Sequence, residues 1–357
     1  MFGFFDRKDR LNALAETGKT ARVLRLVAGG ADINRLDAAG DTPLLSALSA
    51  LPFAHRETAD ALIAAGANVN CRRRDARFDH TPLTLAAQKG FCSTVKLLLK
   101  AGAEVNAVTE SGTTALIEAA ARNHTDIVRI LLAAGATVHH RDILGRGALC
   151  YAYLNKNEDM VKLLLADGAT LNLPEAAECG QTEQVRHLLK NGADVNEGAP
   201  IIGAAEEEHS DIVRMLIAAG ADVNAQNIVG NTALHYAALW GNNDIADQLL
   251  AAGADTNIAN DYEETPFTLA VRAGMSDCLR LLLTHRQCDH LNSLTQGTTM
   301  LHMAVDGGYT EIVHLLIDAG ADVNRKNIYH NETPISLARR LKLREIVEIL
   351  LEAGATE

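Results

Sequence analysis

Two kinds of short apolar segment alternate along the chain. The first kind is rich in alanine and follows a Thr-Pro-Leu or Thr-Ala-Leu phrase, as in residues 231–238. The threonine can cap a helix, and proline fits the first helical turn because its missing N–H needs no partner there. The second kind, for example residues 127–132 and 312–317, places apolar side chains on two faces of a helix. Such a helix packs between two neighbours, so the pattern predicts stacked helix pairs.

A glycine-centred phrase separates consecutive pairs of these segments. Gly-Ala-Asp-Ile-Asn at residues 30–34 returns in related form at residues 66–70. It continues at eight further glycines: Gly102, Gly135, Gly168, Gly192, Gly220, Gly253, Gly320 and Gly354. Most spacings are 33–36 residues, two are 24 and 28, and the 67-residue interval after Gly253 holds two units. The period therefore predicts eleven units.

These phrases and their spacing resemble the ankyrin repeat family over about residues 8 to 357. The resemblance implies an all-α solenoid in which each unit is a helix pair with a projecting β-turn. It also implies that the turn tips and the first helices form a concave groove that binds other proteins. Polar residues in the first and last units, such as Arg339, Arg340 and Lys342, are expected to face water as caps.

One ankyrin-repeat domain is predicted over residues 1–357. Within it we expect repeats one to five in 8–172, shortened acidic repeats in 173–211, and the C-terminal repeats with their cap in 212–357. The 357 residues include 48% hydrophobic but only 4% aromatic residues. A stack two helices thick explains both values, because leucine and alanine suffice for a narrow core.

Composition also limits the partner and the compartment. The formal charge of −12 makes nucleic acid an unfavourable partner. The six cysteines form no Cys-x-x-Cys pair, and no apolar run is long enough to span a membrane. We therefore expect a cytoplasmic monomer without a membrane segment.

Histidines and motifs give little support for chemistry. His139 and His140 are adjacent, which does not direct both imidazoles to one side of an extended segment, and no ligand group accompanies them. His235 and His302 occupy the histidine of the family's Thr-x-Leu-His phrase, which the resemblance assigns to hydrogen bonds between turn and helix. No catalytic motif is present. We expect no enzyme activity, no metal and no cofactor.

The repeat departs most from its own rule between Gly168 and Gly220. The 24- and 28-residue spacings predict that units six and seven lack most of the turn and part of the first helix. Simple drift would explain the loss, because solenoids tolerate deletions on one face. The alternative is that a bulky part of a partner enters the gap.

Acidic residues gather at the same place. Residues 173–211 carry nine acids and two bases, a net charge of −7. Glu178, Glu206 and Glu207 fall at the ends of first helices, where the resemblance places groove residues. We favour recognition of a protein with a basic protrusion, and a solvated acidic face is the alternative.

Other candidate contacts are apolar or basic. Exposed turn tips are predicted at Ile143, Leu144, Ile228, Val229, Tyr262 and Tyr329, with Arg146 beside the first of them and with Leu239, Trp240 and Arg272 at first-helix ends. Trp240 is the only tryptophan, a type enriched at binding hot spots, although packing between repeats would also explain it. Residues 71–78 form a longer loop with four arginines, ending in Arg77 and Phe78.

The sequence therefore predicts a non-catalytic protein-binding scaffold. A compact array suits an inhibitor, for example an immunity protein that neutralises a toxin. It also suits a bacterial effector. An adaptor role is equally consistent with the array. The alternative is a nucleic-acid- or enzyme-associated regulator that contacts phosphates through the Arg72–Arg77 loop.

Overall fold

The computed structural model describes residues 10–50, 54–72, 79–285 and 291–356. These residues form 22 helices in eleven pairs, and none of them belongs to an extended strand. The predicted all-α repeat fold is confirmed, including the pair within the 67-residue interval. The chain divides into two compact units, residues 1–171 and 172–357. The single domain over residues 1–357 and its division into segments 8–172, 173–211 and 212–357 stay predictions.

Unit 1 contains five helix pairs. Its first helices are α1 (Arg10–Glu16), α3 (Pro43–Ser49), α5 (Pro82–Gln88), α7 (Ala115–Ala121) and α9 (Ala148–Leu154). Its second helices are α2 (Thr20–Ala28), α4 (Arg56–Ala64), α6 (Cys92–Lys100), α8 (Thr125–Ala133) and α10 (Glu158–Ala166).

Unit 2 contains six pairs. Its first helices are α11 (Leu173–Glu178), α13 (Pro200–Glu206), α15 (Ala233–Trp240), α17 (Pro266–Ala273), α19 (Met300–Asp306) and α21 (Pro334–Arg340). Its second helices are α12 (Thr182–Lys190), α14 (Ser210–Ala218), α16 (Asn243–Ala251), α18 (Ser276–His285), α20 (Thr310–Asp318) and α22 (Arg344–Glu352).

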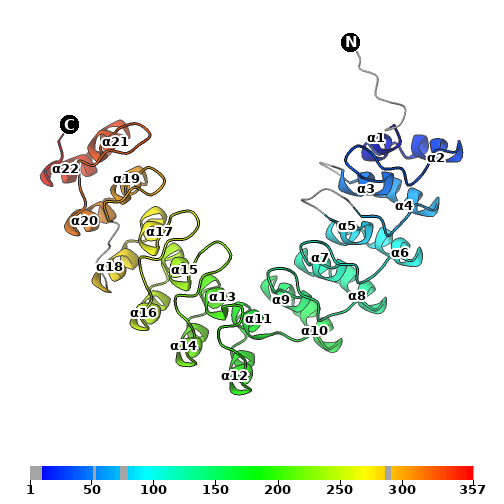
Figure 1. Ribbon diagram of the computed structural model, residues 1–357, viewed down its shortest axis with the longest axis horizontal. Helices are drawn as coiled ribbons and strands as arrows, with labels where there is room; N and C mark the ends of the chain where they lie inside the picture. Colours follow the sequence, from blue (N-terminus) through cyan, green and yellow to red (C-terminus); the bar gives the residue numbers. More distant parts are fainter. Residues whose placement is uncertain (1–9, 51–53, 73–78, 286–290, 357) are drawn as a thin grey trace, which may run out of the picture. The chain divides into compact units, whose positions relative to one another are not determined.

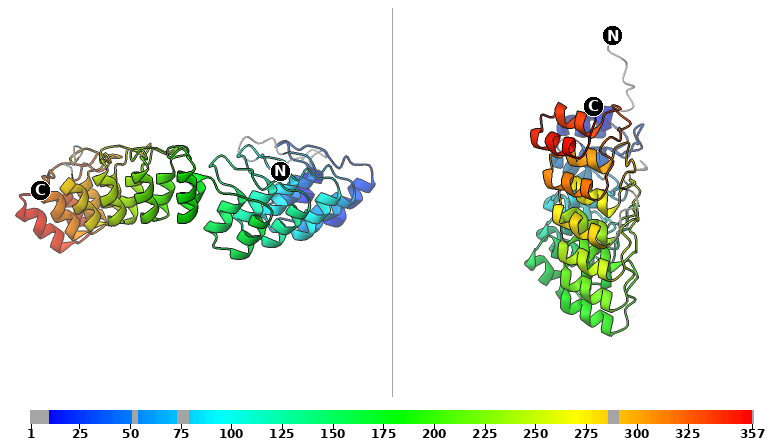
Figure 2. Two further views of the ribbon diagram at one scale, coloured as in Figure 1. Left: turned by 90° about the horizontal axis from the view of Figure 1, so that it is seen from below. Right: turned by 90° about the vertical axis from the view of Figure 1, so that its left-hand side faces the viewer.

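Within each unit the odd-numbered helices form one layer and the even-numbered helices a second layer (Figure 1). The connections that follow the even-numbered helices run along one side of each stack (Figure 2). We call the long connections among them, such as residues 219–232 before α15, fingers. Apolar residues of both layers form the core; in α14, for example, Ile212, Val213 and Leu216 are buried.

Threonine caps begin many of the first helices, as the sequence predicts. The side chain of Thr81 accepts a hydrogen bond from the Thr84 N–H at 3.2 Å, and Thr265 accepts one from Thr268 at 3.3 Å. In both cases the second threonine bonds back to the cap N–H, which completes a capping box. Arg339, Arg340 and Lys342 are exposed in the last repeat, the position expected of cap residues.

The shortened repeats differ from the prediction in one respect. Only residues 167–172 separate α10 from α11, and 191–199 separate α12 from α13, whereas 219–232 separate α14 from α15. The first helices, however, are almost complete: α11 has 6 residues and α13 has 7. The deletions therefore remove fingers and leave the helix layers nearly intact.

Candidate protein-binding surface

In unit 2, three polar contacts join the base of a finger to the first helix that follows it. Asn227 donates through Nδ2 to the Tyr236 hydroxyl at 3.0 Å. Arg272 forms an ion pair with Glu264, and Arg340 forms one with Glu332 at 3.1 Å. The first helices thus form a floor and the fingers a wall that is fixed to it.

The fingers of unit 2 are also bonded to one another. The Asp261 N–H donates to the Val229 carbonyl at 3.1 Å, and the Ile328 N–H donates to the Gly297 carbonyl at 2.9 Å. Between them, Gln296 donates through Nε2 to the Tyr262 carbonyl at 3.1 Å. These bonds link four consecutive fingers into one preorganised row, which reduces the ordering entropy that binding would cost.

Close approach between fingers requires glycine at one point of the row. A Cβ atom on Gly230 would lie 2.9 Å from Asn260 Cα, and the φ of Gly230 is +79°. Any side chain there would push the neighbouring finger away and would adopt an unfavourable backbone conformation. The glycine therefore allows the Val229–Asp261 contact.

Large apolar side chains project from this row. Ile228 is 83% exposed, Tyr329 71% and Tyr262 58%, while Val229 is half-buried. Trp240, at the end of α15, is 52% exposed, and its neighbour Leu239 is half-buried. Ile328, which adjoins Tyr329, is exposed too, although it was not among the predicted contacts. An isolated exposed apolar residue is ordinary, but a row on one face is typical of a binding surface.

The acidic segment contributes less exposed charge than its composition indicates. Glu178 is only 8% exposed, which is inconsistent with its predicted role as a groove-facing charge. The burial is due to Gly203 of α13, which has no side chain and lets α13 pack closely against Glu178 of α11. A Cβ atom added to Gly203 would lie only 3.1 Å from Glu178 Cβ. Glu175 is also buried, in a capping box with Asn172.

The remaining acids divide into paired and exposed groups. Glu183 and Asp211 form ion pairs with Arg186 and Arg214 one helical turn away on their own helices. Glu206 is half-buried, and Glu207 and Glu208 are exposed directly after it. Asp194 and Glu197 are exposed as well, on the short connection 191–199 before α13. Exposed carboxylates therefore lie both before α13 and at its end.

Other predicted contacts fall outside this surface. Ile143 and Leu144 are exposed and Arg146 is half-buried, all on a finger of unit 1. The Ile143 N–H donates to the Ser111 carbonyl at 3.1 Å, so neighbouring fingers are bonded in unit 1 as well. Arg272 lies on the floor of unit 2, and its ion pair with Glu264 gives it a positioning role within the chain.

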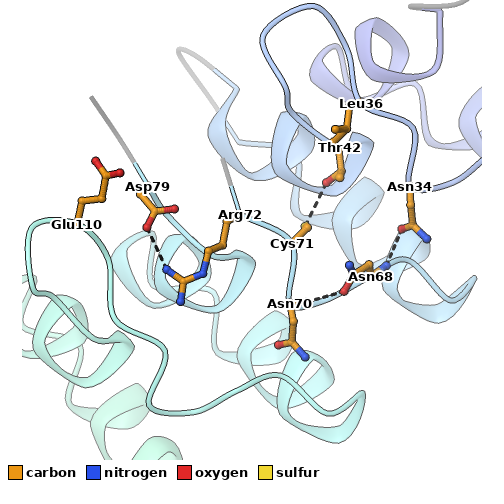
Figure 3. A pocket seen from close by; sticks show the side chains of 9 residues that line it. All are labelled: Asn34, Leu36, Thr42, Asn68, Asn70, Cys71, Arg72, Asp79 and Glu110. Atoms are coloured by element: carbon orange, nitrogen blue, oxygen red, sulfur yellow. Dashed lines mark hydrogen bonds and ion pairs between the residues drawn. The ribbon is translucent and has the colours of Figure 1, made fainter. Parts of the chain in front are cut away.

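The arginine loop lies largely outside the described residues, and this includes Arg77 and Phe78. Arg72 borders a pocket of about 680 Å³ between fingers of unit 1 (Figure 3). Its guanidinium donates to Asp79 at 3.0 Å and to the Val108 carbonyl at 2.8 Å. In the same pocket the Thr42 hydroxyl lies 3.3 Å from Cys71 Sγ. Arg72 is therefore engaged by the chain itself, so a contact with phosphate would compete with Asp79.

The two family histidines have the structural geometry that the resemblance implies. His235 is fully buried, its Nε2 lies 3.1 Å from the Glu264 carbonyl, and Thr232 donates to Nδ1 at 2.8 Å. His302 makes the same contacts with the Glu332 carbonyl and Thr299. The Thr232 N–H also donates to His235 Nδ1 at 3.0 Å, so Nδ1 accepts, Nε2 carries the proton and the ring of His235 is neutral. Burial lowers the pKa of His235 to about 4 and also lowers the pKa of His302.

His139 and His140 do not form a metal site. His140 Nε2 lies 2.9 Å from the Gly112 carbonyl, and His139 is exposed. Among the residues that the structure describes, no three His, Cys, Asp or Glu side chains gather so that they could hold a metal ion. Over the same residues, no helix is both long and apolar enough to cross a membrane.

Comparison with known proteins identifies repeats along almost the whole chain. A family model described as ankyrin repeats (3 copies) matches five overlapping stretches: residues 11–109, 83–175, 173–260, 242–327 and 267–356. The chain is 37% identical over 185 residues to palmitoyltransferase ZDHHC17 of Danio rerio, which covers 50% of this chain and 30% of that protein.

Two further relatives show the same partial overlap. NF-kappa-B inhibitor alpha of Sus scrofa is 35% identical over 156 residues, covering 42% of this chain and 49% of the inhibitor. E3 ubiquitin-protein ligase XBAT33 of Arabidopsis thaliana is 34% identical over 159 residues, covering 37% of this chain and 31% of the ligase. The chain spans less than half the length of each of these relatives, so what they share with it is the repeat array.

Proposed function

Because the chain belongs to the ankyrin-repeat family, whose arrays generally bind proteins without catalysis, we propose that it is a binding scaffold that inhibits a protein partner. The binding surface in this proposal is the floor and wall of unit 2. The single observation that carries it is the row of hydrogen-bonded fingers that exposes Ile228, Tyr262 and Tyr329, together with the exposed Trp240 at the end of α15. Aromatic anchors on a rigid support are typical of binding hot spots.

The partner in this proposal has a basic protrusion. The carboxylates of Glu206, Glu207 and Glu208 at the end of α13 support this choice, because opposite charge accelerates encounter and fixes the orientation of the partner. The absence of a long finger before α13 leaves room for a projecting segment.

The specific role in this proposal is inhibition, including the neutralisation of a toxin. It is supported by the similarity to a relative whose name describes an inhibitor. In the proposal the chain acts as a monomer in the cytoplasm, consistent with the free thiols at Cys71, Cys92, Cys150, Cys179 and Cys278.

Affinity purification of the full chain from native lysate tests this function. We expect one enzyme or toxin in a 1:1 complex, inactive until it is released. Several unrelated proteins, or one that stays fully active when bound, would contradict inhibition and indicate an adaptor.

A matched pair of variants tests the surface in the same experiment. Trp240→Ala combined with Tyr262→Ala should abolish recovery of the partner. Leu351→Ala, at an exposed leucine of α22, should retain it. Equal recovery with both variants would exclude the surface of unit 2.

A further inference from the structure

The surface of unit 2 carries opposite charges at its two ends. At one end, Glu207 and Glu208 are exposed after α13. Asp261 and Glu263, on the second finger of the row, extend the acidic side toward the middle. At the other end, the last finger exposes the two consecutive bases Arg325 and Lys326 and one acid, Asp322. Neither base forms an ion pair within the described part of the chain. On the floor beside that finger, Arg340 is paired with Glu332, so the pair adds no net charge.

We propose that the ligand of this surface is a linear segment with a polar order of charges. Its basic end lies against the end of α13, its centre is apolar, and its acidic end lies against Arg325 and Lys326. This inference rests on the proposed function, and it adds the orientation and the composition of the bound segment.

The apolar centre follows from the residues between the charged ends. Trp240 lies at the end of α15, the first helix that follows α13 in the stack, and Ile228 and Tyr262 are exposed on the fingers that precede α15 and α17. Carboxylates at one end and bases at the other would repel a ligand bound in the reverse direction. Like charges in contact cost more than opposite charges at a rim gain, so the two ends select one direction.

The length of the segment follows from the spacing of the floor helices. Four helix-to-helix steps separate α13 from α21, the helix that follows the Arg325–Lys326 finger. Packed helices lie about 8–10 Å apart, so the segment spans about 30–40 Å. An extended chain covers that distance in about 10–12 residues and a helix in about 20–27.

Selection from a displayed library of random 28-residue peptides on the immobilised full-length chain tests the inference. We expect enriched peptides to carry Lys or Arg at one end, apolar residues in the centre and Asp or Glu at the other end. Repeating the selection on Glu206→Lys/Glu207→Lys should replace the basic end by acids and leave the acidic end. Repeating it on Arg325→Glu/Lys326→Glu should replace only the acidic end.

Binding of one enriched peptide to the variants gives a quantitative test. Each double charge reversal should weaken binding at least tenfold at low salt. Matched reversals on second helices, Asp277→Lys/Glu348→Lys and Lys190→Glu/Arg344→Glu, should change it less than twofold.

The outcomes separate this inference from the proposed function. Enriched peptides that depend on Trp240 but are uniformly basic would overturn the charge order and leave the proposed surface in place. Enriched peptides that bind the Trp240→Ala/Tyr262→Ala variant equally well would overturn the surface itself.

Discussion

Two kinds of connection in unit 2 differ in length but support the same stacking. The long finger 219–232 and the short connection 191–199 each follow a second helix and precede a first helix. In the short connection, the Asn196 side chain accepts the Asp222 N–H of the next repeat at 2.8 Å. In the long one, Asn224 accepts the Asp255 N–H at the same distance. The asparagine of the repeated phrase therefore joins consecutive repeats whether or not a finger is present.

A second contact between repeats is also independent of the fingers. His209 Nε2 lies 3.0 Å from the Glu178 carbonyl in the shortened repeats, and His124 Nε2 lies 3.2 Å from the Gln88 carbonyl in unit 1. The stacking of the repeats is therefore stabilised by the helix layers and by these side-chain hydrogen bonds. The fingers add the exposed tips, which are the parts that a partner would contact.

Breaking a helix layer should have the largest effect on stability. Leu216 in α14 is fully buried, and Leu216→Ala should lower the free energy of unfolding by about 2–5 kcal/mol, because a cavity remains where the side chain was. Urea denaturation followed by circular dichroism would show a lower midpoint. An unchanged midpoint would mean that the layers do not carry the stability.

Acidification should have the next largest effect, through His235. The ring is neutral in the folded state with a pKa lowered to about 4, while an unfolded chain has a histidine pKa near 6.5. The unfolded state therefore binds the proton first. Stability is complete above about pH 6.5 and falls as the pH drops toward 4, by at most about 3 kcal/mol.

A threonine variant is the matched control for this pH dependence. His235→Thr should reproduce the capping boxes of Thr81–Thr84 and Thr265–Thr268 without a titrating group. Urea midpoints measured from pH 7 to pH 4 should fall less steeply in the variant. Equal slopes would show that the buried imidazole does not control the acid sensitivity.

Separating two fingers should have a smaller effect. Gly230→Ala should cost about 1–2 kcal/mol, from the strained φ and from the contact with Asn260. Gly253→Ala is the control, because the φ of Gly253 is +91° and nothing lies within 4 Å of its added Cβ. Only Gly230→Ala should speed hydrogen exchange of the Asp261 amide, which bonds to Val229. Faster exchange of the Asp261 amide in both variants would mean that backbone strain, and not the contact with Asn260, causes the effect.

Changing a fingertip should have the smallest effect on stability. Ile228 is 83% exposed, so Ile228→Ser should shift the free energy of unfolding by less than about 0.5 kcal/mol. Thermal unfolding checks this value. A larger loss would mean that the tip packs within the chain and is not held available for a partner.

Much of the fold could be predicted because each unit repeats the same local signals. Threonine caps identify many of the first helices. The two-faced second helices identify a pair even where the finger is short and no threonine caps the first helix, as in α13 and α14. The exposure of Ile228, Tyr262 and Tyr329 also followed from their place at turn tips. These features depend on neighbours in the sequence.

The details that could not be predicted depend on contacts between repeats. The burial of Glu178 is due to close packing against Gly203, which lies 25 residues later in the chain. Arg272, at the end of α17, forms an ion pair with Glu264 at the base of the preceding finger. The spacing of the repeats does not predict which side chains pair in this way. Charge counted along residues 173–211 therefore overestimated the charge that is exposed.

The central claim is that the fingers and floor of unit 2 bind a partner, and site-specific photocrosslinking in native cells tests it most directly. A photoreactive phenylalanine derivative would replace Tyr262 in one variant and Lys190, which is exposed at the end of α12, in a second variant. A crosslinked partner of defined mass is expected from position 262 and none from position 190. A crosslink from position 190 with none from position 262 would contradict it.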